Sequence, residues 1–170
     1  MESESRKTSL WEDVRYLFVK IGLLALVVVV MVTCFFGIFR SGDNSMKPAV
    51  KDGDLVITLR IQKDYQAGDV IVLENDDKKE IRRVIAVEGD TVDFTEDGMA
   101  INGYLQVESD IYTKTLPYAE GFAFPLTVQE GEVFVLADHR ENATDSRIYG
   151  PVSIERTYGK VMTVIRQRGI

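Results

Sequence analysis

The stretch IGLLALVVVVMVTCFFGIF, residues 21–39, decides how this chain is organised, because it is an unbroken apolar run of 19 residues. As an α-helix it would span roughly 28 Å, close to the hydrocarbon core of a bilayer at about 30 Å. A cleaved signal peptide has a short basic start and ends on small residues, whereas this run follows mixed charges and closes on CFFGIF. The run therefore predicts a retained transmembrane helix.

The charges on either side of the run favour a cytoplasmic amino terminus. Four basic residues precede it and three follow soon after, and basic residues accumulate on the cytoplasmic side of a membrane. Trp11 and Tyr16 suit the membrane interface. We therefore expect a cytoplasmic segment over 1–20, a single-pass anchor in the cell membrane over 21–39, and one extracytoplasmic domain over 41–170.

Composition excludes several classes of function. The chain has a net charge of −7, and residues 1–40 hold five basic and four acidic residues, so about −8 remains on the rest. A negative domain cannot neutralise phosphates, so no nucleic-acid partner is expected. Cys34 is the only cysteine and His139 the only histidine, which leaves neither an internal disulfide nor a cysteine or paired-histidine zinc site. We predict no metal and no cofactor.

Residues 41–170 alternate short β-branched segments with turns rich in glycine and aspartate, which predicts a mainly β domain. Polar turns at 75–79 and 95–98 separate neighbouring segments and indicate antiparallel hairpins. Residues 103–131 alternate poorly and are expected to leave the main sheet, while no part of the domain shows a convincing helical period. The predicted strands are 54–60, 69–74, 80–87, 91–94, 99–101, 132–136 and 159–165.

A serine stands close to the predicted anchor. The sequence Ser45-Met46-Lys47-Pro48 begins six residues after the apolar run, in a turn that also contains Asp, Asn and Gly. A nucleophilic serine needs a base for its proton, donors for the oxyanion and a groove for the peptide. Taken alone, the tetrapeptide is more typical of an ordinary turn serine than of a nucleophile.

Three further segments give the tetrapeptide its meaning. They are KDGD at 51–54, RRVIAVEGD at 82–90 and DHRENATDSRIYG at 138–150. In this order, with the anchor and the tetrapeptide, they resemble the type I signal peptidases, membrane-bound Ser/Lys peptidases that remove signal peptides from exported proteins. The resemblance covers residues 21–164. It implies one N-terminal transmembrane helix followed by an antiparallel β-sheet domain of the signal peptidase I kind.

The resemblance also assigns roles to residues. Ser45 would be the nucleophile, and Met46 and Pro48 would contact the substrate, with Met46 lining a pocket for small side chains. The general base of the family is a lysine followed by Arg-Val, and that position is Arg82 in this chain. The loop that supports the active site would contain Asp145, Ser146 and Arg147.

Three positions depart from the pattern of the family. A guanidinium keeps its proton in proteins, so Arg82 is no proton acceptor, whereas burial lets a lysine act as one. Ala143 stands where the family usually has a serine that hydrogen-bonds the lysine amine. Asp43 stands where serine or glycine is common near the oxyanion hole, and a carboxylate there repels a developing oxyanion unless it points away.

Other basic side chains offer few replacements. In an extended strand Lys78 lies about 13 Å from Arg82, and Lys79 is on the opposite face. Lys47 fits a solvated surface lysine. His139 occupies a position where the family usually has asparagine, and imidazole titrates near neutral pH. It is the candidate substitute base, although an ordinary hydrogen-bonded loop histidine fits the same position.

Two functions stay open. One is a membrane serine endopeptidase that cleaves exported precursors after a small-x-small motif, and the retained Ser45 favours it. The other is a non-catalytic paralogue, a peptide-binding chaperone or assembly factor for surface pili of Gram-positive bacteria, and the three departures at Arg82, Ala143 and Asp43 favour it. Both imply signal peptides or precursors and the lipid bilayer as partners, and the second adds pilin subunits and sortase machinery.

Overall fold

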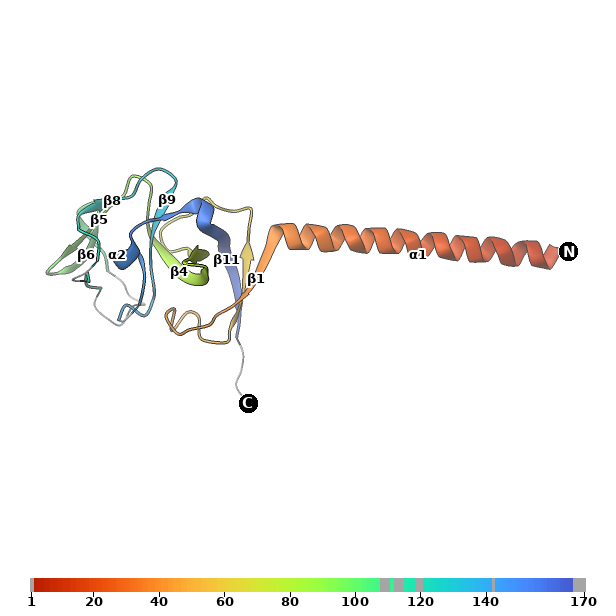
Figure 1. Ribbon diagram of the computed structural model, residues 1–170, viewed down its shortest axis with the longest axis horizontal. Coiled ribbons are helices and arrows are strands. Elements are labelled where there is room, and N and C mark those ends of the chain that lie inside the picture. Colours follow the sequence, from red (N-terminus) through yellow and green to blue (C-terminus); the bar gives the residue numbers. More distant parts are fainter. Residues whose placement is uncertain (1, 108–110, 112–114, 119–120, 142, 167–170) are drawn as a thin grey trace. The chain divides into compact units, whose positions relative to one another are not determined.

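The computed structural model describes the chain except residues 1, 108–110, 112–114, 119–120, 142 and 167–170, and it divides into two units. The first unit is residues 1–36 and the second is residues 37–170. Figure 1 shows a long helix in the first unit and β-sheets in the second. The mainly β fold with an N-terminal helix, expected from the sequence, is confirmed.

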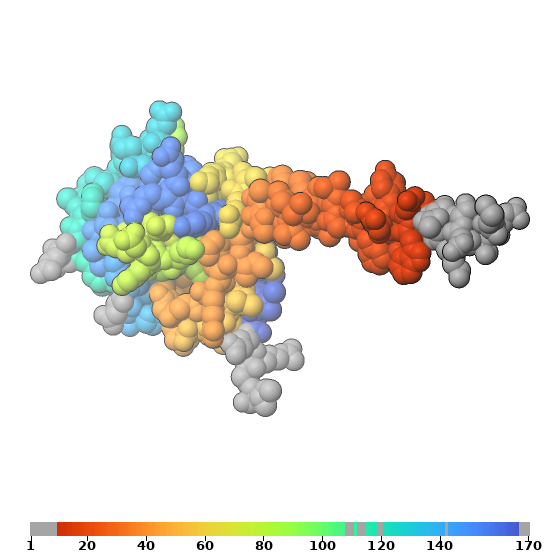
Figure 2. All heavy atoms as spheres, turned by 45° about the vertical axis from the view of Figure 1, so that its right-hand side comes forward, coloured from red at the N-terminus to blue at the C-terminus, as the bar shows by residue number. Residues whose placement is uncertain are grey.

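The first unit consists of helix α1 (Glu2–Phe35). Within it, Leu10–Phe35 is long and apolar enough to cross a membrane by length and composition. Figure 2 shows the side chains of this segment standing on the outer surface of the helix, in keeping with their high exposure. Residues 21–35 of this helix carry no charged side chain on any side, which suits a lipid environment.

The helix ends earlier than the apolar run predicts. Residues 36–39 belong to strand β1 (Phe36–Arg40) rather than to a helix continuing to residue 39. Gly37 and Phe39 are buried while their neighbours are exposed, which is the period of a strand. The Phe39 ring packs against Tyr158 with centroids 5.3 Å apart, so packing within the second unit gives this end of the run its strand conformation.

The second unit contains two sheets. The larger has seven strands in the order β1-β2-β11-β3-β4-β9-β10, and its pairings from β2 to β10 are antiparallel. The smaller is antiparallel in the order β7-β6-β5-β8, and α2 and a 3-10 turn complete the unit. The bounds are β2 (Leu55–Leu59), β3 (Val70–Asn75), β4 (Lys78–Val87), β5 (Thr91–Thr95), β6 (Gly98–Ile101), β7 (Tyr104–Leu105), β8 (Leu126–Thr127), β9 (Glu132–Leu136), α2 (Ser146–Tyr149), β10 (Val152–Ser153), η1 (Ile154–Arg156) and β11 (Thr157–Ile165).

Each of the seven predicted strands is present, and every predicted end lies within two residues of the observed one. The polar turns at 75–79 and 95–98 join the paired strands β3 and β4, and β5 and β6, as predicted. The described part of 103–131 supplies β7 and β8 to the smaller sheet. Residues 108–110, 112–114 and 119–120 of that excursion lie outside the described part of the chain.

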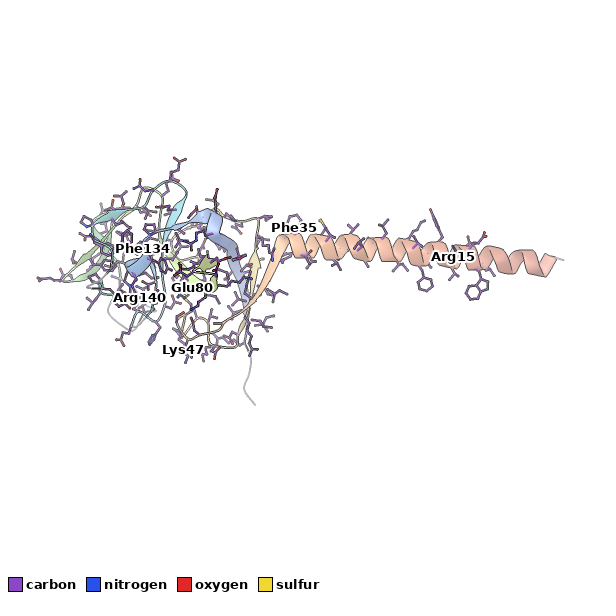
Figure 3. The ribbon with its side chains drawn as sticks, viewed as in Figure 1. Arg15, Phe35, Lys47, Glu80, Phe134 and Arg140 are labelled. Carbon is purple, nitrogen blue, oxygen red and sulfur yellow. The ribbon has the colours of Figure 1, made fainter. Side chains whose placement is uncertain are left out.

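Apolar side chains from the strands form the core of the second unit. One cluster centres on Ile71, Val84 and Val135, and another on Phe134 between the two sheets. Figure 3 shows Phe134 within this unit and Lys47 at its edge. A backbone hydrogen bond of 2.8 Å from the His139 amide to the Ser45 carbonyl then ties the turn before β2 to the loop after β9.

Candidate active site

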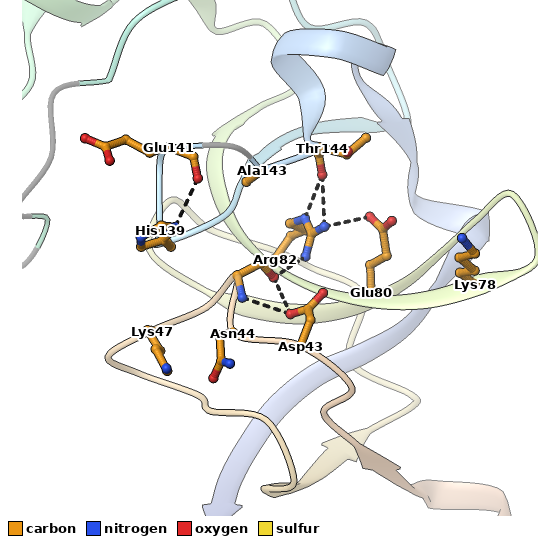
Figure 4. Close-up of a pocket in the computed structure, with 11 residues that line it drawn as sticks. Asp43, Asn44, Lys47, Lys78, Glu80, Arg82, His139, Glu141, Ala143 and Thr144 are labelled. Carbon is orange, nitrogen blue, oxygen red and sulfur yellow. Dashed lines mark hydrogen bonds and ion pairs between the residues drawn. The ribbon is translucent and has the colours of Figure 1, made fainter.

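A pocket of about 640 Å³ lies where three segments of the second unit meet (Figure 4). The turn before β2, strand β4 and the loop after β9 each contribute to its wall. The pocket brings together Ser45, Arg82 and His139, which lie far apart in the sequence. Its lining residues are Asp43, Asn44, Ser45, Lys47, Lys78, Glu80, Arg82, His139, Glu141, Ala143 and Thr144.

The Ser45 hydroxyl lies between a carboxylate and a guanidinium. Ser45 Oγ donates to Asp43 Oδ1 at 2.7 Å and accepts from Arg82 Nη1 at 2.9 Å. The Ser45 backbone N–H also donates to Asp43 Oδ1, at 2.9 Å. Within the described part of the chain, no amine or imidazole nitrogen is hydrogen-bonded to Ser45 Oγ.

The Arg82 side chain is only 3% exposed and fully engaged. Besides Ser45 Oγ, its Nη1 donates to Ile81 O at 2.7 Å, and its Nε and Nη2 donate to Thr144 O at 3.2 and 2.9 Å. Its Nη2 also lies 3.1 Å from Glu80 Oε2 in an ion pair. The four hydrogen bonds and the ion pair engage all three nitrogens of the guanidinium, whereas a lysine amine has one nitrogen with three donors. The site is therefore built around a permanent cation.

Glu80 reinforces that cation. It lies two residues before Arg82 on the same face of β4, and its side chain is 15% exposed. Burial raises the pKa of the Glu80 carboxyl, and the Arg82 guanidinium opposes that rise. A carboxylate at this position favours the charged form of any basic side chain at residue 82.

Burial also raises the pKa of the Tyr149 phenol, so Tyr149 keeps its proton and is no base either.

Three of the basic residues considered from the sequence, His139, Lys47 and Lys78, line the pocket, and none of their side chains is hydrogen-bonded to Ser45 Oγ. The His139 ring is exposed and its Nδ1 pairs with the Glu141 carbonyl at 3.0 Å, which places the proton on that nitrogen. Lys47 and Lys78 are exposed wall residues. The role of His139 as a substitute base stays a hypothesis.

Met46 and Pro48 do not line the pocket. Met46 is 1% exposed and packs in the core with Val50 and Val56, and its sulfur accepts from the Asp138 amide at 3.4 Å. Met46 therefore anchors the Ser45 turn to the core. Pro48 is exposed. The substrate contacts predicted for both residues stay predictions.

Asp145, Ser146 and Arg147 hold the loop after β9. Arg147 Nε and Nη2 bind the two carboxylate oxygens of Asp145 at 2.9 and 2.8 Å, and all three residues are buried. Asp145 Oδ2 also accepts from the Ala137 amide at 3.2 Å, and Ser146 Oγ accepts from the Val135 amide at 3.0 Å. These bonds join the end of the loop to the end of β9. They thereby hold Thr144, whose carbonyl accepts from Arg82.

Two partners of Arg82 were not identified from the sequence. Glu80 carries a signal, since it stands two residues before Arg82 in a predicted strand and must share its face. Thr144 acts through its backbone carbonyl, which any residue supplies, so its identity carries no signal. Across the described residues, no group of three His, Cys, Asp or Glu side chains is placed to hold a metal ion.

Comparison with known proteins agrees with this architecture. A family model described as signal peptidase, peptidase S26, matches residues 14–165. The chain is 30% identical to signal peptidase I of Bacillus licheniformis over 159 residues, which cover 86% of this chain and 82% of that protein. It is 32% identical to signal peptidase IB of Staphylococcus aureus over 140 residues, 69% and 71% of the two chains.

A crystal structure of a signal peptidase I from Enterococcus faecalis is also similar, with a TM-score of 0.48 and 28% identity. The matched part covers 58% of this chain and 97% of the Enterococcus faecalis chain. The chain thus combines an N-terminal helix long and apolar enough to cross a membrane with a β domain that has a serine in its pocket. On the family match, the chain belongs to the S26 signal peptidases.

Proposed function

We propose that this chain is a signal peptidase I-like protein that binds the signal peptides of exported precursors at the outer face of the membrane without cleaving them at a peptidase's rate. One observation carries the proposal. The group that lies 2.9 Å from Ser45 Oγ at the position of the family's base is the Arg82 guanidinium, and it cannot accept a proton. Membership in the signal peptidase family supports precursors as the ligands.

The chemistry of acyl transfer explains why this one group matters. A serine attacks a peptide carbonyl only as its proton leaves, and general bases work best when their pKa lies near the working pH. Arg82 fails this requirement, and Tyr149 fails it because burial holds its proton in place. Binding depends on the pocket and the fold instead, and both are present without a base.

A slow endopeptidase is the second candidate. Ser45 is retained, and its hydroxyl donates to the Asp43 carboxylate at 2.7 Å, so a weak proton acceptor is within reach. In this case the chain would cleave after a small-x-small motif, as the resemblance implies. His139 in the same pocket wall would be a further acceptor if the side chain turned toward Ser45.

Binding without turnover suits a chaperone or assembly role. A protein that holds an exported subunit by its signal region and releases it intact protects it until assembly. The resemblance to pilus-associated relatives with altered catalytic residues supports pilin subunits of Gram-positive bacteria as cargo and sortase machinery as the recipient.

The experiment is a binding measurement with the full chain in detergent micelles. A fluorescent precursor with a small-x-small signal should bind saturably and equally to the wild type and to Ser45→Ala. A matched precursor in which both small residues are replaced by phenylalanine should bind more weakly. Equal binding of the two precursors, or none of either, would contradict the proposed recognition.

A further inference from the structure

We propose that Asp43 suppresses the reactivity of Ser45 by occupying, with its own carboxylate, the place where a substrate oxyanion would be bound. The inference deepens the proposed function and rests on it, since it names a second cause of low turnover besides Arg82. Its basis is one oxygen atom. Asp43 Oδ1 accepts from both the Ser45 N–H, at 2.9 Å, and the Ser45 Oγ–H, at 2.7 Å.

The Ser45 amide is the donor at issue. When a serine attacks a carbonyl, the carbonyl oxygen becomes an oxyanion beside the nucleophile, where preorganised backbone N–H groups stabilise it. The nucleophile's own amide is one of the nearest such donors. Here that amide already donates to a carboxylate oxygen, so a substrate oxygen meets an occupied donor and a negative charge.

The main chain around Asp43 is held by the rest of the unit. Ser41 Oγ donates to the Asp43 carbonyl at 3.2 Å, and the Ser41 amide donates to the Asp54 carbonyl at 2.8 Å. The Arg82 guanidinium, bound to the same hydroxyl as the carboxylate, adds an attractive charge nearby. Asp43 is therefore fastened at the serine by backbone bonds and by charge.

The same carboxylate is also a candidate base, but Oδ1 cannot accept the Ser45 proton productively while it occupies the Ser45 amide. A base at Asp43 would receive the Ser45 proton on Oδ1 while the Ser45 amide stabilises the oxyanion. In the structure Oδ1 itself accepts the hydrogen bond from that amide, which is therefore not free for an oxyanion. Removing the carboxylate distinguishes the two roles, because it frees the donor in one case and destroys the proton acceptor in the other.

A fluorophosphonate probe on the full chain in detergent gives the test. Ser45 Oγ attacks phosphorus, the P–F bond breaks with loss of fluoride, the hydroxyl proton passes to buffer, and a phosphonyl-serine remains. We expect Asp43→Ser to raise the rate of labelling at residue 45 by about 10²-fold, the size of one oxyanion donor. Asp52→Ser removes an exposed carboxylate from the next turn of the chain and should leave the rate unchanged, while Ser45→Ala should abolish labelling.

A fall in labelling, or no change, in a folded Asp43→Ser chain would overturn the proposal, and a fall would identify Asp43 as the base. If Asp43→Ser does not fold, Asp43→Gly carries the test, since it removes the carboxylate and leaves no side-chain oxygen to accept from the Ser45 amide. Its labelling should then rise above wild type, and a rate at or below wild type would overturn the proposal. Precursor cleavage by the wild type bears on the proposed function instead and is measured separately.

Discussion

Arg82 and Glu80 lie on one face of β4, and together they decide whether a basic side chain at residue 82 can ever be neutral. A lysine needs a dry site with few negative neighbours to lose its proton near pH 7. The site has the burial, but it also has the Glu80 carboxylate 3.1 Å from the guanidinium. Restoring the family's lysine is therefore insufficient by itself.

A set of variants tests this argument in the Asp43→Ser background. Arg82→Lys with Ala143→Ser supplies the amine and the hydroxyl that the family would pair with it. Adding Glu80→Gln should raise precursor cleavage about tenfold or more, because a neighbouring opposite charge shifts a pKa by roughly 1 to 3 units. Adding Glu96→Gln instead, in an exposed hairpin turn, is the control and should leave the rate of precursor cleavage unchanged. Equal rates with and without Glu80 would show that the carboxylate is irrelevant.

Glu80 also predicts a dependence of stability on pH. Burial raises the pKa of Glu80 above its ordinary value of 4.5, so between these two values the folded state binds more protons than the unfolded state. The free energy of unfolding then rises as the pH falls through this window. In urea unfolding of the full chain, the free energy of unfolding of the wild type should rise relative to that of Glu80→Gln as the pH is lowered from neutral toward 4.5. A gain in the opposite direction would mean that the Arg82 ion pair outweighs burial.

At the scale of elements, the loop after β9 depends on the Asp145–Arg147 pair at the start of α2. Both side chains are buried and joined by two bonds. Arg147→Met leaves a buried carboxylate without its cation, which costs about 3–5 kcal/mol. Arg156→Met, at an exposed position, is the control and should change the urea midpoint little. A loss below about 1 kcal/mol for Arg147→Met would contradict a structural role for the pair.

The strands of the second unit were predictable because β-branched segments alternate with Gly/Asp turns. Strand β1 was not, because Phe36 and Ile38 are as apolar in a membrane helix as in a strand. Gly37 was the available signal, since a Cβ there would lie 2.6 Å from the Phe39 ring and 2.7 Å from Thr58 Oγ1. Strands β7, β8 and β10 have two residues each and α2 has four, too few to show a period.

Part of the candidate site was likewise predictable from the sequence, and part was not. Ser45, Arg82 and the 138–150 loop were identified because the family motifs contain them, and the absence of a base at residue 82 follows from side-chain chemistry alone. The direction of the Asp43 carboxylate was left open, since a turn residue can point toward or away from its neighbour. The role of the Thr144 carbonyl and the contacts of all three guanidinium nitrogens could be found only from the folded geometry.

At the scale of the whole molecule, the account requires the second unit to lie outside the cell. Impermeant maleimide labelling of intact cells tests this in a Cys34→Ser chain, since Cys34 is the only cysteine. We expect Asp97→Cys, in the exposed turn between β5 and β6, to be labelled from outside. Ser5→Cys, before the apolar run, should be labelled only after the cells are lysed. The reverse pattern would place the domain in the cytoplasm.

The central claim is that no side chain among the described residues takes the Ser45 proton efficiently. Single-turnover cleavage tests it most directly, with the full chain in detergent at large excess over a signal-bearing precursor and with Ser45→Ala alongside. The account predicts that product forms no faster with wild type than with Ser45→Ala, while both bind the precursor. Rapid cleavage that disappears in Ser45→Ala would contradict it.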